Sequence, residues 1–504
     1  MTAIAAINVE FVPTQIENSE VNWKERLISF PVKIYKGFLN LLERIYNSAL
    51  LILDVHFLRP RLTDVNLLRP VGRCLGKEPY ISEVSTLAKK LHVTSDPEVM
   101  KEILKNYHND PNGIFFGGRT MTIIIFDLFQ ALLPEEKVTR EDFLLSCNPD
   151  NLKKYLALLN NFLSPSQIAK SAPLIQEIVA AELKAWENES NTNGSLNISE
   201  ATKVYATKVV FKLIFGHECP LDDIKEIIHA LDSLNQFIMG QFSLGKTAAE
   251  TLQFTESDKK KMLDSLRKVI DSILKVENEG NDYLISRMKK DPFFTDAKIK
   301  IMIVTILMAG QETTAAVLAE AIRQLAQPQN HSYQDDVRAE IKQTGYDPSK
   351  NPTNIKLTSV ENIFIEALRL HPAGYIIPRD ASKNLTCVIS DKKTNEVLKK
   401  HPIAKGEGVN ACPYFAARNP DKFPEPNTFK PERHQGVRTV LSWLPFSHGV
   451  EPCPGQWLAR NEIRLMLGNL LARFTLTTSQ GEIGQKGLLT LKHKEDVKIT
   501  LTPV

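Results

Sequence analysis

The chain has 504 residues, of which 43% are hydrophobic and 24% are charged, and its formal net charge is +3. This length and apolar content suffice for one globular enzyme with a large core. The nearly neutral charge argues against nucleic acid as a partner. The six cysteines lack zinc-binding spacing and no secretory signal is evident, so we expect reduced thiols and a cytoplasmic location.

Residues 1–64 are predicted to form an N-terminal extension, in which 23–58 carry an amphipathic helical pattern. Lys33, Lys36 and Arg44 are dispersed among its apolar residues, and the uncharged stretches are too short to span a bilayer. Such a helix either lies in a membrane interface or packs its apolar stripe on the protein's own core. Peripheral membrane contact is therefore one of two alternatives for this segment.

Residues 65–504 are predicted to form one main domain, rich in helices and with short strands, which fits a layered α+β arrangement. Helical periodicity predicts helices at 97–108, 150–162, 170–188, 199–215, 221–239, 257–277, 296–327, 358–370 and 456–474. Strands are predicted at 86–94, 374–389, 405–411 and 487–502. The stretch 240–253, which contains Gly240 and Gly245, is predicted to be a mobile lid between two helices.

A polar cluster interrupts the long apolar helix predicted at 296–327. Gly310 relaxes the helix locally, and the hydroxyls of Thr313 and Thr314 can turn toward preceding carbonyls and loosen the hydrogen-bond ladder where a small ligand must fit. Glu312 indicates a helix that crosses a protein core rather than a membrane. The alternative is a solvated polar patch on an ordinary helix.

Glu366 and Arg369 stand three residues apart in ENIFIEALRLHP (361–372) and so lie on one helical face. An acid and a base at this spacing are common, so the motif alone is weak. Its apolar neighbours indicate burial, and a buried ion pair persists only when its remaining hydrogen bonds are satisfied. A third partner is therefore required, and Arg433 in the proline-braced loop 423–434 is the candidate.

Cys453 lies in PFSHGVEPCPG (445–455), a loop whose phenylalanine, glycines and cysteine are spaced to hold a haem iron by one thiolate. A thiolate ligand pushes electron density onto the iron and favours cleavage of the O–O bond. Phe446 would cover the sulfur, while Gly449 and Gly455 allow a tight turn and a close approach to the porphyrin. The alternative for an isolated Cys-Pro-Gly is a buried structural cysteine.

Four motifs occur in the order and at the separations of one family: AGQETT (309–314), EALR (366–369), PER (431–433) and FSHGVEPCPG (446–455). From about Lys77 to its C-terminus the chain resembles the cytochrome P-450 family of haem-thiolate monooxygenases. The resemblance implies a mainly α fold with small β-sheets and a long central helix over haem b. It also implies a small apolar substrate, O2 and a separate electron donor, which is a ferredoxin, a flavodoxin or a reductase.

The resemblance also assigns roles to single residues. Cys453 is similar to the axial ligand of the haem iron, and Thr313 with Glu312 is similar to the alcohol and acid that deliver protons. The structural ion triad of the family corresponds to Glu366, Arg369 and Arg433. Arg379 falls where the family often places a propionate partner. The residues expected to contact the cofactor are Cys453, Phe446, Gly449, Gly455, Arg379 and Ala309.

The sequence departs from the family pattern around the haem propionates. Glu451 stands two residues before the cysteine, where the family usually has Arg or His. Because a carboxylate adds like charge beside two propionates, either it turns outward into solvent or a cation such as Arg379 neutralises it. The helix expected near 148–164 lacks the usual Trp or His and Arg, so Lys153 or Lys154 would have to substitute as point charges.

We therefore expect a monomeric haem-dependent monooxygenase that inserts one oxygen atom from O2 into an apolar organic substrate such as a fatty acid, a steroid or a terpene-like molecule. Its pocket is expected to be apolar and walled by Ala309, Ile376, Ile377 and aromatic residues such as Phe115, Phe116 or Phe242. Two alternatives stay open. One is a haem-thiolate peroxygenase or isomerase without external electrons, and the other is a non-catalytic haem-binding relative.

Overall fold

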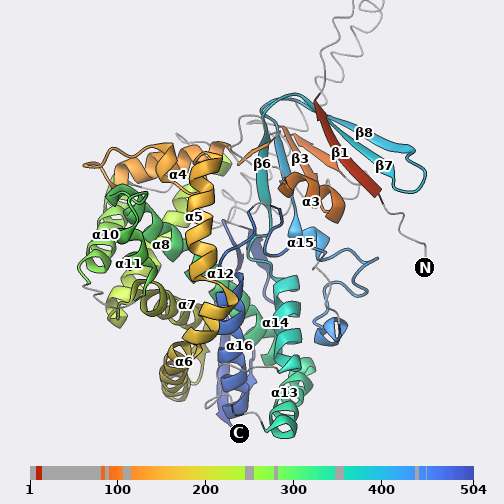
Figure 1. Cartoon of the computed structure of the whole chain (residues 1–504). Helices are drawn as coiled ribbons and strands as arrows, with labels where there is room; N and C mark the ends of the chain where they lie inside the picture. The colour runs from red at the N-terminus through yellow and green to blue at the C-terminus, as the bar shows by residue number, and fades with distance from the viewer. Residues whose placement is uncertain are drawn as a thin grey trace, which may run out of the picture.

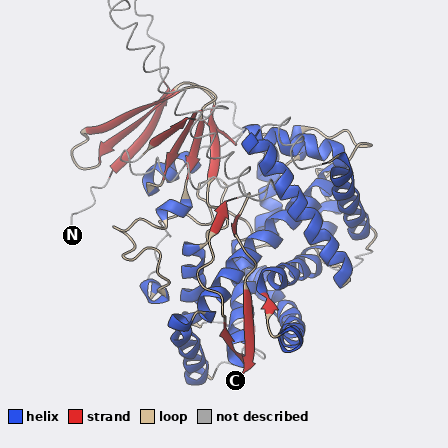
Figure 2. Cartoon of the chain, turned by 180° about the vertical axis from the view of Figure 1, so that it is seen from behind, coloured by secondary structure: helices blue, strands red, loops and turns tan. Residues whose placement is uncertain are grey.

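The computed structural model describes residues 7–13, 81–85, 90–105, 115–117, 119–244, 255–276, 282–345, 347, 357–436, 442–449, 451–487 and 489–504. The amphipathic segment 23–58 and residues 245–253 of the expected lid lie outside these ranges. A group of strands lies beside a larger helical region (Figure 1). Figure 2 shows the same division from behind, with most strands gathered at one end of the molecule.

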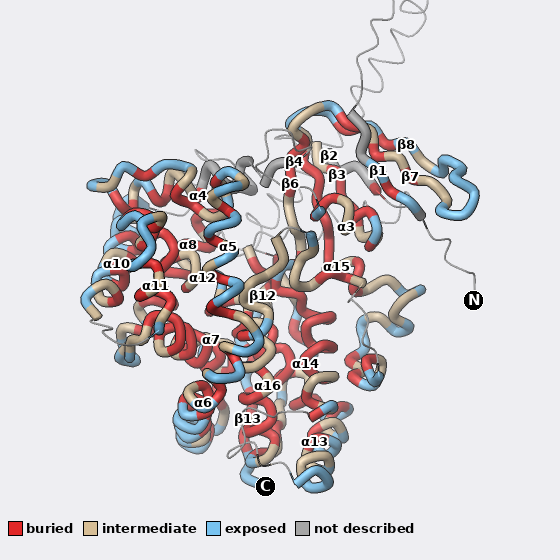
Figure 3. Tube along the Cα trace, viewed as in Figure 1, coloured by how far each residue is buried: buried red, intermediate tan, exposed pale blue. Residues whose placement is uncertain are grey.

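Helices make up most of the described chain. They are α3 (Pro97–Lys105), α4 (Arg119–Leu132), α5 (Pro149–Phe162), α6 (Pro165–Asn193), α7 (Ile198–Val209), α8 (Leu221–Leu244), α10 (Glu256–Leu274), α11 (Leu284–Lys290), α12 (Asp296–Ala326), α13 (His331–Thr344), α14 (Thr358–Leu370), α15 (Pro413–Ala416) and α16 (Gln456–Arg473). α12 runs through the middle of the helical region, where α7, α14 and α16 pack against it. Figure 3 shows that α14 and α16 are mostly buried.

Local sequence explains where the central helices begin and end. Thr295 caps α12 by accepting a hydrogen bond from the Lys298 amide at 3.3 Å, and Pro328 follows the last turn of that helix. α14 ends before Pro372, as expected because proline disfavours the helical conformation of the residue before it. α16 begins directly after the cysteine loop, with Gly455 as its N-cap.

The larger sheet has five strands in the order β2-β3-β9-β6-β4. Their bounds in that order are Ser82–Ser85, Lys90–Thr94, Gly408–Ala411, Ile377–Ala381 and Phe115–Gly117. β3 and β9 are parallel, and the other neighbouring pairs are antiparallel. The register places Arg379 of β6 opposite Gly117 and Val409.

A second sheet contains the N-terminal strand. β1 (Ile7–Pro13), β7 (Leu385–Asp391) and β8 (Val397–Ile403) form it in that order, with antiparallel pairing. Val9 of β1 and Ile81 belong to one buried apolar cluster with side chains of α3, β6, β7, β8 and β9. A strand inside the expected extension 1–64 is therefore an integral part of the fold.

Two small sheets complete the helical region. β10 (Phe474–Thr477), β13 (Lys498–Pro503) and β5 (Leu196–Asn197) form a three-stranded sheet. β11 (Gln485–Gly487) and β12 (Leu491–His493) form an antiparallel hairpin. β12 of this hairpin brings Lys492 to Glu312 of α12.

The mainly α architecture with small sheets is confirmed, and each predicted helix has a counterpart. The sequence patterns did not predict four helices and six strands: α4, α11, α13, α15, β1, β2, β4, β5, β8 and β10. α4 is largely apolar in sequence, and α13 is strongly polar with Gln334 and Val337 as its buried residues. Among the described residues, α12 has the length and hydropathy of a membrane span, but most of its apolar stretch is buried inside the protein.

Candidate haem-thiolate site

The loop that holds Cys453 is closed by a backbone hydrogen bond. The Cys453 amide donates to the Phe446 carbonyl at 2.8 Å, and the Gln456 amide of α16 approaches the Cys453 carbonyl at 3.4 Å. A Cβ on Gly455 would stand 3.9 Å from Cys453 Sγ, an ordinary van der Waals contact, so Gly455 lies directly beside the sulfur at the start of the helix. The loop therefore presents one thiol at the N-terminus of α16.

Electrostatics at the sulfur combine burial with backbone donors. Burial raises the pKa of the Cys453 thiol, and the backbone amides of Gly455 and Gln456 oppose that rise. Amide donors and a helix N-terminus stabilise a negatively charged sulfur. The site is thus one where a thiolate is favoured once a cation binds it.

Gly449 is required by the fold of the loop itself. Its φ is +82°, and a Cβ at this position would meet the carbonyl oxygen of Leu104 at 2.3 Å, at the end of α3. Any other residue would have to adopt the left-handed region and displace α3. The close approach that sequence analysis expected toward a porphyrin is here an approach to helix backbone.

The predicted ion triad is assembled around Glu366. Arg369 grips the carboxylate with Nε and Nη2, each at 2.8 Å, and Arg433 Nε lies 3.1 Å from Oε1. The remaining donors of Arg369 reach backbone carbonyls, including that of Pro426 at 2.6 Å. Glu366 and Arg369 are fully buried. Burial of the Glu366–Arg369 pair predicts a third partner, and Arg433 occupies that position.

His434 is a fourth member that sequence analysis missed. Its Nε2 lies 2.8 Å from Glu366 Oε2, and the Lys430 amide donates to Oε1 at 2.9 Å. Burial alone would raise the pKa of Glu366, but the hydrogen bonds from Arg369 and His434 lower it to about 2. The position of His434 directly after Arg433 was the available signal, because both residues belong to one 3-10 turn (Pro431–His434).

The polar turn of α12 makes local and long-range contacts. The hydroxyl of Thr313 donates to the Ala309 carbonyl at 2.7 Å, the back-bonding expected of a threonine that loosens a helix. The next hydroxyl, of Thr314, donates to the carboxyl of Glu462 on α16 at 3.0 Å. Glu462 is buried, and burial raises its pKa to about 8, against the opposing effect of the Thr314 hydrogen bond. α16 thus brings a neutral acid beside this turn at neutral pH.

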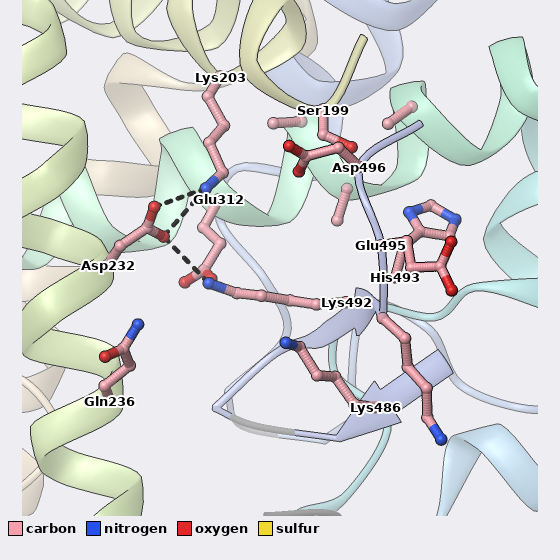
Figure 4. A pocket seen from close by; sticks show the side chains of 14 residues that line it. Ser199, Lys203, Asp232, Gln236, Glu312, Lys486, Lys492, His493, Glu495 and Asp496 are labelled. Carbon is pink, nitrogen blue, oxygen red and sulfur yellow. Dashed lines mark hydrogen bonds and ion pairs between the residues drawn. The ribbon is translucent and has the colours of Figure 1, made fainter. Parts of the chain in front are cut away.

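Glu312, the predicted acid of the proton-delivering pair, faces a different direction from Thr313. Its side chain is buried, forms an ion pair with Lys492 of β12 and accepts a hydrogen bond from Asn235 of α8. Lys492 also lies 3.1 Å from Asp232. These charged groups line a cavity of about 220 Å³ between α7, α8, α12 and β12, whose lining does not include Thr313 (Figure 4).

The expected propionate partners have a mixed outcome. Arg379 forms an ion pair with Glu451 at 3.3 Å, so of the two expectations for Glu451 the structure shows neutralisation by a cation. Lys153 is exposed and pairs with Asp150 at 3.6 Å. Lys154 lies over the ring of Phe293. Lys153 is thus engaged within α5, and Lys154 is engaged by Phe293. The geometry therefore supports Arg379 as a propionate partner more than either lysine.

A separate group of potential metal ligands is explained without a metal. Glu320, His371 and His493 bring ligand atoms within 4.8 Å of one another. Arg323, however, donates to both carboxylate oxygens of Glu320, at 2.9 and 3.0 Å. Both ring nitrogens of His371 are engaged, by a backbone carbonyl at 2.9 Å and a glutamine amide at 3.1 Å. A guanidinium on the carboxylate leaves no place for a second cation.

A helical fold with one thiol at a helix N-terminus and a buried glutamate-arginine network defines the class of proteins that bind a haem iron through a cysteine. Comparison with known proteins agrees. The family model described as cytochrome P450 matches residues 80–499, and the chain belongs to the cytochrome P450 family. Members are monooxygenase oxidoreductases that bind haem b through a cysteine thiolate and use O2, a separate electron donor and hydrophobic substrates.

Individual relatives are distant. The chain is 25% identical over 439 residues to "Probable cytochrome P450 516A1" of Dictyostelium discoideum, which covers 81% of this chain and 82% of the relative. It is 25% identical over 331 residues to abscisic acid 8'-hydroxylase 1 of Oryza sativa subsp. japonica, covering 65% and 66%. It is 33% identical over 199 residues to cytochrome P450 81Q32 of Catharanthus roseus, covering 38% and 37%.

The residues present fit a haem. Cys453 offers a sulfur at the N-terminus of α16, where the backbone amides of Gly455 and Gln456 favour the thiolate. Arg379 is about nine-tenths buried, and its Nε has no acceptor among the described residues. A buried N–H without an acceptor is costly, and a propionate oxygen would satisfy it.

Proposed function

We propose that this chain is a P450 monooxygenase in which Cys453 ligates the haem iron and one oxygen atom from O2 is inserted into an apolar organic substrate. The single observation that carries the proposal is the placement of Cys453 Sγ at the N-terminus of α16, with backbone amides of Gly455 and Gln456 directed at it. That arrangement favours a thiolate ligand. Family membership supports the reaction class.

The bound haem supplies oxygen activation, which the thiolate promotes by pushing electron density onto the iron. The chain's own residues hold and orient the participants. Arg379 offers a buried guanidinium to a propionate. The Thr313 hydroxyl, which donates to the Ala309 carbonyl, holds a proton at Oγ1 on the central helix. Together these residues support cofactor binding and proton transfer in a protein-lined site.

The hydrophobic substrates of the family support our proposal for the substrate class, and the expected apolar wall of the pocket is consistent with it. Ile376 and Ile377 are half-buried just before and at the start of β6, while the side chains of Phe115, Phe116 and Phe242 lie outside the described residues. We propose a fatty acid, a steroid or a terpene-like molecule. The abscisic acid named for the rice relative belongs to the last of these classes. A monomeric state, a cytoplasmic location and a ferredoxin, flavodoxin or reductase as donor remain our predictions.

Substitution of the cysteine tests the proposal. The reduced, carbonyl-bound parent should show the red-shifted Soret band of thiolate ligation, and Cys453→Ser should abolish it. Cys219→Ser is the matched control, because Cys219 is a free, half-buried cysteine elsewhere in the fold and its loss should leave the band unchanged. A normal thiolate band in Cys453→Ser would show that another residue ligates the iron.

The peroxygenase alternative is separated by the source of electrons. A monooxygenase should convert an apolar substrate with O2 only when a reductant and an electron donor protein are present. Turnover with hydrogen peroxide alone, at the same rate as with O2 and reductant, would favour the peroxygenase. Haem retention with no product in either assay would favour a non-catalytic relative.

A further inference from the structure

Three charged side chains from distant parts of the chain meet beside the polar turn of α12. Glu312 of α12 pairs with Lys492 of β12, and Lys492 Nζ also lies 3.1 Å from an oxygen of Asp232 on α8. We call these three residues the charge clamp. Lys203 of α7 extends it by pairing with Asp232 at 2.7 Å. Figure 4 shows Lys492 reaching between Asp232 and Glu312 across the cavity.

The charge clamp is partly shielded from water, and together with Lys203 it is electrically balanced. The side chains of Glu312, Lys492 and Asp232 are 4%, 18% and 29% exposed, so the ion pairs are screened much less than surface pairs. Lys203 and Lys492 carry two positive charges, and Asp232 and Glu312 carry two negative charges. Removing Lys492 would leave the buried Glu312 carboxylate without its counter-ion, which is costly, while Asp232 would keep its pair with Lys203.

Both charged partners of Lys492 keep it ionised. Burial alone would lower the pKa of Lys492, but Glu312 and Asp232 raise it above its ordinary value. Burial alone would raise the pKa of Asp232, but Lys492 and Lys203 lower it. An ammonium held in this way is a poor proton donor, because giving up its proton would break both ion pairs. The charge clamp is therefore suited to holding geometry rather than to moving protons.

The charge clamp contacts α12 at the turn that carries Thr313. Successive residues of an α-helix are rotated by about 100°, so Glu312 and Thr314 lie on nearly opposite sides and Thr313 lies between them. Glu312 is tied to β12 and α8, while Thr314 is tied to Glu462 of α16 at 3.0 Å. Contacts on both sides fix the rotation of the helix at the turn that carries Thr313.

We propose that Lys492 is a positioning residue for Thr313, and that Glu312 serves as the anchor on α12 through which it acts. This inference rests on the proposed function, because the orientation of Thr313 matters only if that hydroxyl serves the haem. It differs from the sequence-based expectation that Glu312 itself delivers protons. The cavity between α7, α8 and β12 is then the space around the anchor rather than a substrate pocket.

The first test measures the rigidity of α12 in the haem-loaded full chain. Amide hydrogen exchange by mass spectrometry should become faster in peptides that cover 305–316 when Lys492→Met removes the ammonium. Lys492→Arg retains the charge and should restore the parental exchange. Lys494→Met is the matched control: Lys494 lines the same cavity from the same segment and forms no ion pair with a described residue. This control should exchange as the parent does.

The second test measures the consequence for the site. Without substrate, electrons supplied by a reductant leave as hydrogen peroxide or as water, and the division depends on proton delivery. In Lys492→Met a displaced Thr313 hydroxyl should raise the hydrogen peroxide released per electron toward its limit of one peroxide for every two electrons. Lys492→Arg and Lys494→Met should match the parent.

A reserve variant keeps the test decisive if Lys492→Met does not fold. Lys492→Met combined with Asp232→Asn removes one charge of each sign and leaves Glu312 without its lysine. Parental exchange and a parental peroxide ratio in either folded variant would overturn the proposal, as would an equal effect of Lys494→Met. Failure of the proposed function looks different, because the parent itself would then lack the thiolate band of the ferrous carbonyl complex.

Discussion

Arg379 Nη2 on β6 lies 3.3 Å from Glu451 Oε2, two residues before the cysteine of the haem site. The side chains of Arg379 and Glu451 are 10% and 16% exposed. Arg379 Nη1 donates to the Pro378 carbonyl at 3.0 Å, and the buried Nε has no acceptor among the described residues. Where the family usually places a second cation, this protein pairs its arginine with an anion. In the haem complex that we propose, one guanidinium would serve both a carboxylate of the protein and a carboxylate of the haem.

Removing that anion should strengthen cofactor binding. We predict that Glu451→Gln slows haem loss, because Arg379 is then free to make its charge-assisted hydrogen bonds to a propionate. Glu451→Arg should slow haem loss further, because a newly made charge-assisted pair with a propionate adds at most a few kcal/mol to the free energy of haem binding. Haem transfer to an excess of apomyoglobin measures the rate.

The control is Glu396→Gln, an exposed glutamate in the turn between β7 and β8, which should lose haem at the parental rate. Faster haem loss from Glu451→Gln would contradict the prediction. That result would mean that Glu451 holds Arg379 in its productive orientation.

Acid should weaken the fold through Glu366. Its pKa is lowered to about 2 in the folded protein, against an ordinary value of 4.5. A carboxylate with a depressed folded pKa stabilises the fold above its unfolded pKa, and this contribution is lost as the pH falls from about 4.5 to about 2. The loss amounts to about 3 kcal/mol. Urea unfolding at a series of pH values measures it.

Glu366→Gln separates this carboxylate from all others. At neutral pH the variant should be less stable by about 3 to 5 kcal/mol, because Arg369 is left buried without its counter-ion. Between pH 4.5 and 2 its stability should fall less steeply than that of the parent. Parallel pH profiles for parent and variant would show that other groups dominate acid unfolding.

The parts of the site that sequence predicted are those built from local patterns. Helical spacing puts Glu366 and Arg369 on one face, and burial of the pair demands a third partner such as Arg433. Cys453 stands out because it alone among the six cysteines has glycines and a phenylalanine at loop-forming spacing. In each case a few residues that are neighbours in sequence determine the local structure on which the prediction rests.

Contacts between distant segments escaped prediction because no local pattern encodes them. Lys492 and Glu312 are 180 positions apart, and a lone lysine in a short strand is ordinarily a solvated residue. β1 pairs with β7 across more than 370 positions, so its short alternating pattern had no visible partner. His434 was missed although it adjoins Arg433, since a histidine can satisfy a carboxylate only where the tertiary fold brings the two together.

The pairing of β1 leads to a prediction about membrane topology. Val9 and Ile81 lie in one buried cluster, so the chain on both sides of residues 14–80 belongs to the same folded body. We predict that, in any membrane-associated form, the N-terminus lies on the same side of the membrane as the catalytic domain. Epitope tags at the two ends should then be cleaved together when sealed vesicles are treated with protease.

A variant of β1 provides the matched comparison. Val9→Asp places a charge in the buried cluster and should release the strand, whereas Glu10→Gln changes an exposed neighbour and should not. In Glu10→Gln, as in the parent, both tags should be cleaved together by the protease. Protection of the N-terminal tag alone in the parent would show that the two ends lie on opposite sides, against the prediction.

A neutral carboxyl on α16 should give the protein an unusual dependence on pH. Glu462 is 2% exposed, and burial raises its pKa to about 8, although the Thr314 hydroxyl donates to it at 3.0 Å. A group whose folded pKa is raised binds its proton more tightly in the folded state. Stability is therefore lost as the pH rises from about 4.5 to about 8, and by pH 7 the loss is about 3 kcal/mol.

Glu462→Gln cannot ionise, so its unfolding free energy should fall less than that of the parent over this range. Glu495→Gln, which changes an exposed carboxylate, should keep the parental slope. Urea unfolding between pH 5 and 8 distinguishes the three proteins. If parent and Glu462→Gln lose stability equally as the pH rises, Glu462 is ionised in the folded state and must have a cationic or solvent partner.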